Sequence, residues 1–393
     1  MTVEVMSGNY AQSYAAKLAR VDVIAAYPIT PQTSIVEKLA QFVASGELKA
    51  KYVPVESEHS ALQTVLSASG MGARTYTATS GQGLLLMHEL LHWATGVRAP
   101  IVMGVVNRAV AAPWNIGADH ADTISQRDTG WLQFYAESNQ EVLDTVLQAF
   151  RLAEDPEIRL PVMINEDAFY LSHTVEPVDL PDQAAVDRFL PRRRPVAVLV
   201  PGTTGRLGSF TGPEDHVRFR REMSKATDRV PKVFSVVEEE FRRLIGRDYG
   251  GALPLYKTDD ADAILLTMGT IATTARTVVD ELRSEGRKVG LARIRQFRPF
   301  PADELRALAA RVDRIGVVDR SFTFGGLGAT AVETRSALYP SPHRPMVGNF
   351  LAGVGGRDVT PTEVRAIFDT LLGSHVPEVE WSDLKAEEEV VHG

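Results

Sequence analysis

The feature that most constrains the fold is a regular alternation between short apolar runs and longer amphipathic runs. Short runs rich in β-branched and aromatic residues are typical of strands, and apolar residues three and four apart are typical of helices. The first half of the chain predicts strands at 21–27, 51–56, 74–80, 99–106 and 160–165, and helices at 34–44, 58–69, 84–94 and 140–154. The strand APIVMGVV is apolar almost throughout, as strands covered on both faces are. This order predicts an α/β fold with a parallel sheet between two layers of helices.

A second alternating block predicts a second α/β domain with a parallel sheet. Its strands are predicted at 263–269, 288–294 and 314–320, and its helix at 274–286 ends at a glycine, a common C-terminal stop. The predicted organisation is a first domain at 1–173, a linker rich in Pro, Asp and Arg at 174–195, a second domain at 196–375 with a polar helical excursion at about 210–250, and an acidic tail at 376–393. We expect the excursion to pack on either domain or on a partner. The tail is expected to be solvated, with docking through Trp381 as the alternative.

Charge and composition exclude several classes of function. The chain has 393 residues, a formal net charge of −8 and no cysteine. General binding of nucleic acid or anionic membranes requires clustered positive charge, and the run RRR at 192–194 is too short to supply it. Disulfides, thiolate zinc sites and thiolate-held iron–sulfur clusters are excluded from this chain. No signal pattern and no apolar stretch near 18 residues is found, which predicts a cytoplasmic protein.

Two familiar motifs favour structural roles over ligand binding. HELLH at 88–92 matches a zinc-binding pattern, but it lies in an apolar run that favours a packed helix, and we predict no metal ligands there. FGGLGAT at 324–330 does not fit the dinucleotide fingerprint, which favours close backbone packing over phosphate binding. The chain also lacks the Gly-Asp-Gly segment and the Walker lysine loop that hold phosphates. If it helps to bind a phosphorylated cofactor, a partner must hold the phosphates.

Polar residues follow most of the strands predicted for the first domain. Ligands of open parallel sheets bind beyond the carboxyl ends of the strands. The candidates there are Thr30, Glu56, Glu58, Ser80, Gln82, Asn107, Arg108, Asn115, Asp119 and His120. Most α/β domains carry polar residues at this edge, so their position alone does not specify a function.

Five segments together resemble one enzyme family. They are YPITPQT (27–33), ESEHSA (56–61), TATSGQGLLLMHE (77–89), NRAVAAPWNIGADHADTISQRDTGW (107–131) and RIRQFRPFP (293–301). In this order they resemble the alpha subunit of the 2-oxoacid:ferredoxin oxidoreductases, and the likeness runs from about residue 5 to about residue 370. The resemblance implies a domain for the pyrimidine side of thiamine diphosphate, followed by a domain like the C-terminal domain of transketolase.

The resemblance also implies an activity and a set of partners. A complex of this kind decarboxylates a 2-oxoacid oxidatively, releases carbon dioxide and transfers the acyl group to coenzyme A. A beta subunit would hold the diphosphate, its Mg²⁺ and an iron–sulfur cluster, and gamma and delta subunits would complete the complex. Electrons would pass to ferredoxin, or through a flavin subunit to NAD. The oxoacid stays open between pyruvate, branched-chain and aromatic types such as phenylglyoxylate. The alternatives are a component of a non-oxidative thiamine diphosphate enzyme and a non-catalytic assembly subunit.

The resemblance assigns roles to three residues. Glu58 would hydrogen-bond N1′ of the cofactor pyrimidine and favour its imino form; Glu56 is the rival, and a helix cap is the structural alternative. Thr30, held between Pro28 and Pro31, would hydrogen-bond the oxoacid carboxylate. Its structural alternative is a helix cap, a role that Thr33 or Ser34 can also fill. Arg108 would pair with the substrate carboxylate; a structural ion pair with Asp119 or Asp122 is its alternative.

Other residues are weaker candidates. Those expected to contact the cofactor are Pro28, Ile29, Ser80 and Gln82, and those expected at the substrate pocket or a subunit interface are Trp114, Asn115, Asp119 and His120.

Overall fold

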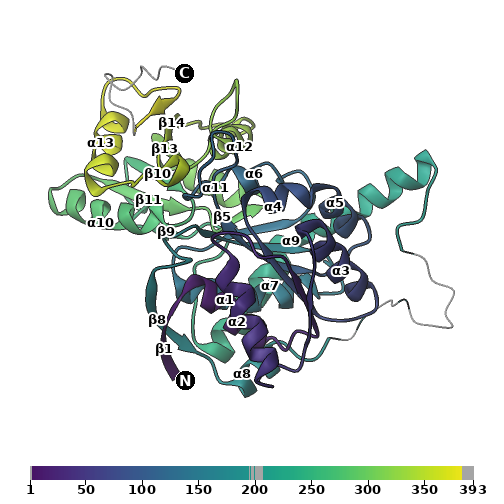
Figure 1. Ribbon diagram of the computed structural model, residues 1–393. Coiled ribbons are helices and arrows are strands. Elements are labelled where there is room, and N and C mark those ends of the chain that lie inside the picture. Colours follow the sequence, from purple (N-terminus) through teal and green to yellow (C-terminus); the bar gives the residue numbers. More distant parts are fainter. Residues whose placement is uncertain (1, 194, 196–198, 200–206, 383–393) are drawn as a thin grey trace.

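Two large sheets organise the chain, and Figure 1 shows the two α/β domains that form around them. The computed structural model describes residues 2–193, 195, 199 and 207–382. The first domain contains α1 (Gly8–Leu18), β2 (Val23–Ala26), α2 (Thr33–Ala44), β3 (Lys51–Pro54), α3 (Glu58–Gly70), β4 (Thr75–Thr79), α4 (Gly81–Leu86), α5 (His88–Gly96), β5 (Val102–Asn107), α6 (Ala121–Ile124), β6 (Leu132–Tyr135), α7 (Asn139–Ala153) and β7 (Val162–Asp167). The predicted α/β class with parallel sheets is confirmed.

The first sheet has seven strands in the order β12-β6-β7-β5-β4-β2-β3. All neighbours are parallel except β12 (Gln296–Arg298), which runs antiparallel to β6. Apolar side chains of α1, α2 and α7 cover one face, and those of α3, α4 and α5 cover the other. Helices on both faces bury the central strands of the sheet, and every residue of β4, β5 and β7 is buried.

The second sheet has six strands in the order β15-β14-β13-β10-β11-β9. Only β9 is antiparallel to its neighbour. The elements of this domain are β9 (Leu255–Tyr256), β10 (Ala263–Thr267), α10 (Ile271–Ser284), β11 (Val289–Arg293), α11 (Ala302–Ala309), β13 (Arg314–Asp319), α12 (Ala329–Leu338), β14 (Met346–Leu351), η1 (Val354–Gly356), α13 (Pro361–Leu372) and β15 (Glu380–Trp381).

The segment predicted as a linker is regular structure over most of its length. β8 (Val175–Leu180) pairs antiparallel with β1 (Thr2–Ser7), and α8 (Gln183–Phe189) buries Val186 and Phe189 in the first core. The prediction of a linker was therefore wrong over 175–189. The Pro and Asp residues of this segment are typical of linkers, but here they belong to an edge strand. Proline is tolerated there because one side of the strand needs no partner.

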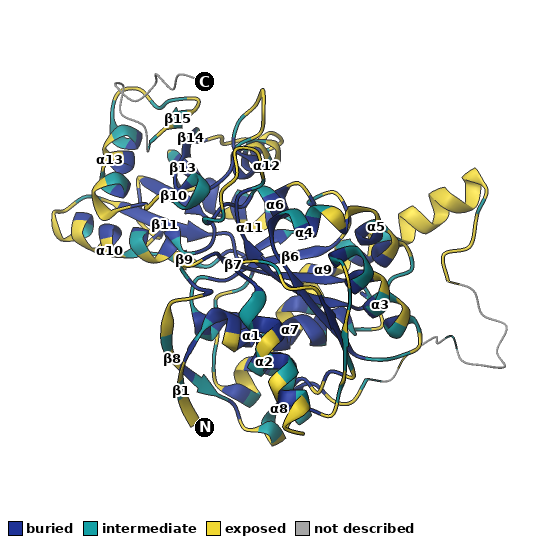
Figure 2. Cartoon of the chain, viewed as in Figure 1, coloured by how far each residue is buried: buried dark blue, intermediate teal, exposed yellow. Residues whose placement is uncertain are grey.

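The helical excursion is one long helix that packs on the first domain. α9 (Pro213–Ile245) places Ala226, Val230, Phe234, Val237, Phe241 and Ile245 in the first core. Its N-terminal part is exposed and projects from the body, as Figure 2 shows. The boundary predicted at 196 and the tail beyond Ser382 fall among residues that lie largely outside the described ranges.

Candidate functional site

Glu58 lies at the start of α3, immediately after the turn that follows β3. Its side chain is 7% exposed, and no hydrogen bond from any described residue ends on its carboxylate. The capping role belongs to Ser57, whose hydroxyl accepts a hydrogen bond from the Ser60 amide at 3.2 Å. A Cβ atom on Gly83 would lie 2.7 Å from Glu58 Oε1, so glycine is required for the carboxylate to lie over α4.

Glu56 has a different environment from Glu58. Its side chain is exposed and accepts a hydrogen bond from the Ser60 hydroxyl, and this bond lowers the pKa of Glu56. The rival glutamate is therefore a solvated group at the end of a strand, while Glu58 is a buried carboxylate without a hydrogen-bond partner among the described residues.

Arg108 follows β5 and connects two neighbouring loops. Its Nη1 donates to the Thr30 carbonyl at 2.6 Å, and its Nη2 donates to Gln82 Oε1. The side chain is 5% exposed, and burial lowers its pKa even though the carboxylates of Asp122 and Glu58 act in the opposite direction.

The structural ion pair considered for Arg108 does not occur in the described structure. Among the described residues, the guanidinium contacts the Thr30 carbonyl and Gln82 but no carboxylate, and its Nε and the neighbouring Gln82 Nε2 are buried without acceptors. Asp122 instead accepts hydrogen bonds from the backbone amides of Arg108 at 3.1 Å and Gly81 at 3.0 Å. Burial raises the pKa of Asp122 to about 6, although hydrogen bonds from Asn107 and these amides lower it.

The other residues predicted to contact a cofactor lie at the same edge of the sheet, and they differ in burial and in hydrogen bonding. Pro28 is exposed, Ile29 is half-buried, and the Ile29 amide donates to Gln32 Oε1 at 3.3 Å. The Ser80 hydroxyl is buried and donates to the Val106 carbonyl at 2.6 Å. The hydroxyl hydrogen of Ser80 is therefore already bound to the sheet, and contact of Ser80 with a cofactor remains a prediction.

Trp114 and Asn115 are not brought to the group formed by Glu58, Arg108 and Thr30. The Asn115 amide donates to the Gly355 carbonyl in the second domain at 2.8 Å, and Trp114 is 72% exposed. A Cβ atom on Gly117 would lie 2.2 Å from the Gly355 carbonyl oxygen, so this loop packs directly on η1. Their assignment to a substrate pocket stays a prediction without support from these contacts.

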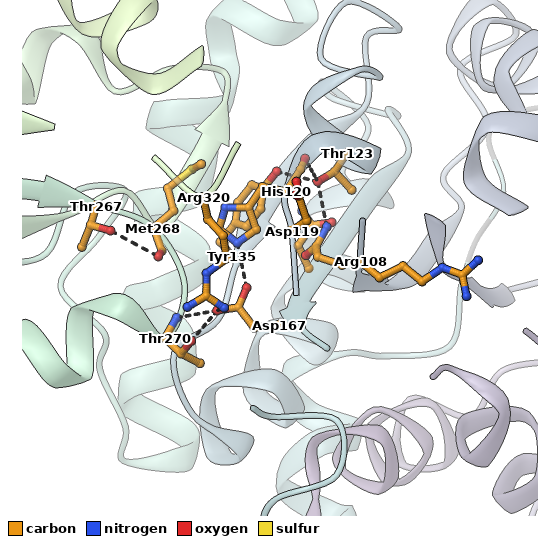
Figure 3. A network of polar contacts seen from close by, with 12 residues as sticks. Arg108, Asp119, His120, Thr123, Tyr135, Asp167, Thr267, Met268, Thr270 and Arg320 are labelled. Carbon is orange, nitrogen blue, oxygen red and sulfur yellow. Dashed lines mark hydrogen bonds and ion pairs between the residues drawn. The ribbon is translucent and has the colours of Figure 1, made fainter. Parts of the chain in front are cut away.

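Asp119 and His120 belong to a buried network between the two domains, which Figure 3 shows with the Arg108 side chain directed away from it. His120 Nε2 lies 2.7 Å from Asp167 Oδ1, and the Thr270 amide donates to Asp167 Oδ2 at 2.9 Å. Burial alone would raise the pKa of Asp167, but Arg320, His120 and Thr270 hold it well below its ordinary value.

The two motifs interpreted as structural have structural contacts. His88 Nδ1 contacts Gln126 Oε1, and no cluster of His, Asp and Glu suited to a metal occurs among the described residues. In the glycine-rich segment, Asp319 accepts hydrogen bonds from the amides of Thr330 at 2.9 Å and Ala331 at 3.1 Å. A carboxylate of the chain itself therefore occupies the N-terminus of α12, where a phosphate would bind.

Comparison with family models decides the family. The model described as "Pyruvate flavodoxin/ferredoxin oxidoreductase, thiamine diP-bdg" matches residues 14–239, and "Pyruvate:ferredoxin oxidoreductase core domain II" matches residues 261–364. The chain belongs to the 2-oxoacid:ferredoxin oxidoreductase family, among its alpha subunits. The family resemblance predicted from the five segments is confirmed, and the first domain is of the thiamine diphosphate-binding type.

Two curated relatives cover nearly the whole chain. Ketoisovalerate oxidoreductase subunit VorA of Pyrococcus horikoshii is 49% identical over 97% of this chain and 98% of its own. Pyruvate synthase subunit PorA of Methanothermobacter thermautotrophicus is 46% identical over 99% of this chain and 100% of its own. These relatives of the family are named as subunits of larger oxidoreductases.

Two solved structures share the fold. The 2-oxoglutarate:ferredoxin oxidoreductase of Magnetococcus marinus has a TM-score of 0.72 at 19% identity, covering 94% of this chain and 65% of that chain. A split-gene transketolase, described as an inactive beta4 tetramer, has a TM-score of 0.56 at 11% identity, covering 93% of this chain and 98% of that chain. None of the described helices of this alpha subunit has the length and apolar character that crossing a membrane requires.

The sequence did not reveal three buried residues that shape this site. Asn9 and Gln32 bind the turn around Thr30, and Asp122 binds the amides of Gly81 and Arg108. The sequence predicts Asp122 only as an alternative ion-pair partner of Arg108. Nothing in the local sequence of Asn9 or Gln32 distinguishes them from ordinary helix and turn residues.

Proposed function

We propose that this alpha subunit belongs to a complex that oxidatively decarboxylates a 2-oxoacid to an acyl-CoA, with release of carbon dioxide and transfer of electrons to iron–sulfur clusters on partner subunits. The observation that carries the proposal is that two unpaired buried groups lie at the same edge of the sheet: among the described residues, the Glu58 carboxylate has no hydrogen-bond partner and the Arg108 guanidinium has no ion-pair partner. The names of the relatives, pyruvate synthase and ketoisovalerate oxidoreductase, agree with this class of reaction.

The residues at the sheet edge fit one half of thiamine diphosphate. The Glu58 carboxylate is available to a ring nitrogen of the pyrimidine, and the buried Gln82 Nε2 has no acceptor among the described residues. When bound, the cofactor supplies the electron sink that a 2-oxoacid needs in order to lose carbon dioxide. Because the chain lacks a Gly-Asp-Gly segment, we assign the diphosphate and its Mg²⁺ to a beta subunit. Gamma and delta subunits, the clusters, coenzyme A and a ferredoxin or flavin and NAD acceptor belong to the same proposal.

We assign the binding of the oxoacid carboxylate to Arg108 and Thr30. Arginine has five N–H donors, and the described structure uses only two of those on Arg108, so donors remain for an anion. The Thr30 hydroxyl makes no hydrogen bond to any described residue, and its backbone carbonyl is already held by Arg108. A carboxylate bound by this pair would lie beside Gln82 and Glu58. The oxoacid itself is proposed to be pyruvate, a branched-chain acid or an aromatic acid.

The test replaces each glutamate separately in the complete complex, purified anaerobically. We expect Glu58→Gln to lower the CoA-dependent oxidation of the preferred oxoacid by about 100-fold or more, because acid–base groups contribute effects of this size. Pyruvate, 2-oxoisovalerate and phenylglyoxylate are assayed in parallel.

Glu56→Gln is the matched control, since Glu56 is exposed and bound only to Ser60, and it should retain nearly the wild-type rate. Near-normal turnover in Glu58→Gln would contradict the assignment, and turnover without CoA or an electron acceptor would favour the non-oxidative alternative.

A further inference from the structure

The turn that carries Thr30 has few backbone hydrogen bonds of its own. It connects the end of β2 at Ala26 to the start of α2 at Thr33, and two of its residues, Pro28 and Pro31, have no N–H group. Among the described residues, one backbone hydrogen bond lies within the turn, from the Gln32 amide to the Ile29 carbonyl at 2.8 Å. Groups outside the turn must therefore determine its shape.

Three successive carbonyls of the turn are each bound by a different donor. They are Ile29 O with Gln32 N at 2.8 Å, Thr30 O with Arg108 Nη1 at 2.6 Å, and Pro31 O with Asn9 Nδ2 at 2.7 Å. The backbone on both sides of Thr30 is thus fixed, while the Thr30 side chain is exposed and makes no hydrogen bond to a described residue. The turn presents this hydroxyl from a rigid support.

Asn9 holds the turn from α1. Its side chain is fully buried, and Nδ2 donates both to the Pro31 carbonyl and, at 2.7 Å, to the Ser34 hydroxyl in the first turn of α2. A carbonyl can only accept, so the amide nitrogen and not the amide oxygen must face Pro31. Asn9 therefore connects α1 to the end of the turn and to the start of the next helix.

Gln32 holds the turn against the sheet. Its side chain is fully buried; Nε2 donates to the Ala78 carbonyl of β4 at 2.8 Å, and Oε1 accepts from the Ile29 amide at 3.3 Å. This amide therefore fixes the distance between the turn and the strand that leads to Ser80 and Gln82.

We propose that Asn9 and Gln32 are positioning residues for the 2-oxoacid, acting through Thr30. Neither side chain has a surface that could meet a ligand, since both are fully buried. They fix the backbone from which the Thr30 hydroxyl and N–H project, and this role rests on the proposed function of Thr30. A donor that is held in place needs no reorganisation when it binds an anion, so loosening the turn should weaken binding of the oxoacid carboxylate.

The test uses substitutions that keep side-chain volume and remove the hydrogen bonds, made in the complete complex. Asn9→Leu and Gln32→Met should each raise KM for the oxoacid by about tenfold, with a smaller change in kcat and unchanged binding of thiamine diphosphate. The matched controls are two other fully buried amides. Asn139 donates to the carbonyls of Met6 at 3.0 Å and Thr174 at 2.7 Å, and Gln12 accepts from the Tyr76 hydroxyl at 2.6 Å. Asn139→Leu and Gln12→Met should lower thermal stability to a similar extent and leave KM unchanged.

A double-mutant cycle separates positioning from general damage. In a Thr30→Ala background, Asn9→Leu should cause no further rise in KM, because residues that act through one another are not additive. Additive effects, or a rise in KM equal to that of Asn139→Leu, would overturn the proposal. If Asn9→Leu fails to assemble, Gln32→Met and its Gln12→Met control decide the question. An inactive Glu58→Gln complex together with wild-type KM in both turn variants would reject the positioning role alone, whereas an active Glu58→Gln complex would reject the proposed function.

Discussion

Two glycines after β4 leave room for the charged side chains of the site. A Cβ atom on Gly81, which has a φ of +46°, would lie 2.4 Å from Arg108 Nε, and one on Gly83 would lie 2.6 Å from Thr79 Oγ1. Substitution at either position would displace Arg108 or Glu58. The two glycines of the motif TSGQG are therefore explained by the side chains of Arg108 and Glu58, which lie against them.

Residues that follow strands could be predicted as site candidates, whereas the residues that support them could not. Glu58, Thr30 and Arg108 follow different strands of one parallel sheet, and the topology brings their ends to one edge. Asn9 and Gln32 donate to backbone carbonyls of other segments. Every residue has such a carbonyl, so the sequence does not indicate which one a side chain will bind. Their partners become visible only when the elements have been packed together.

Arg108→Lys should raise KM for the oxoacid by about tenfold or more in the complete complex. The compact ammonium of lysine lacks the planar fork of arginine, so it cannot span the Thr30 carbonyl, Gln82 and a carboxylate in their present positions. Each hydrogen bond to a charged group contributes about 1.5–3 kcal/mol. Steady-state kinetics with the preferred oxoacid measure the effect. Arg74→Lys is the control, because Arg74 is equally buried and binds Glu154 through two nitrogens without any contact with the site. Equal changes in KM in the two variants would contradict a specific role for Arg108.

At the scale of elements, long strands with both faces buried were predicted well, and short or polar elements were not. The strand predicted at 99–106 corresponds to β5, and the helix predicted at 58–69 corresponds to α3. The single helix predicted at 84–94 is two helices, α4 and α5, that meet at Met87. Its apolar residues continue without interruption, so hydrophobic pattern alone gives no sign of the change in direction.

Strand β7 ends with two adjacent carboxylates in opposite environments. Successive side chains of a strand point to opposite faces of the sheet. Asp167 contacts His120 and Arg320, while Glu166 is buried against Gly8 of α1, with the Gln12 side chain near its carboxyl group. Burial is the main reason why the pKa of Glu166 is raised to about 8.

Glu166→Gln should therefore change how stability depends on pH. The folded chain holds the Glu166 proton more tightly than the unfolded chain, so wild-type stability is lost as pH rises from about 4.5 to about 8. Glutamine stays neutral, and the variant should gain roughly 4 kcal/mol relative to wild type between pH 5 and pH 8. Urea denaturation of the full chain at both pH values measures this difference. Parallel pH profiles for the two proteins would show that Glu166 ionises normally.

At the scale of the whole molecule, the two domains are joined more closely than the order of the sequence suggests. β12 lies between the second-domain elements β11 and α11 in sequence but forms the edge of the first sheet, where its Gln296 pairs with Phe134. Arg293 and Arg295, on either side of the crossing, both bind the buried Glu141 of α7. A three-residue strand is too short to be recognised by periodicity, so the sequence predicted two consecutive domains without this exchange.

Asp167 is the centre of the polar contact between the domains. Its carboxylate contacts His120 of the first domain and accepts a hydrogen bond from the Thr270 amide of the second. Its Oδ2 also lies 3.5 Å from Nη1 of Arg320, a residue that is 3% exposed. Within the described structure, no other carboxylate forms an ion pair with Arg320. The cost of removing one member of a buried pair is large because the remaining charge stays buried.

Asp167→Asn should consequently lower the free energy of unfolding by about 3–5 kcal/mol, and the second domain should become more sensitive to proteolysis than the first. Urea denaturation of the full chain, followed by limited proteolysis with mapping of the cleavage sites, measures both effects. The control is Asp280→Asn, since the ion pair of Asp280 with Lys257 is exposed and contributes little. A change no greater than that of the control would show that Arg320 is stabilised without Asp167, and that apolar packing and the β12 exchange are sufficient to hold the domains together.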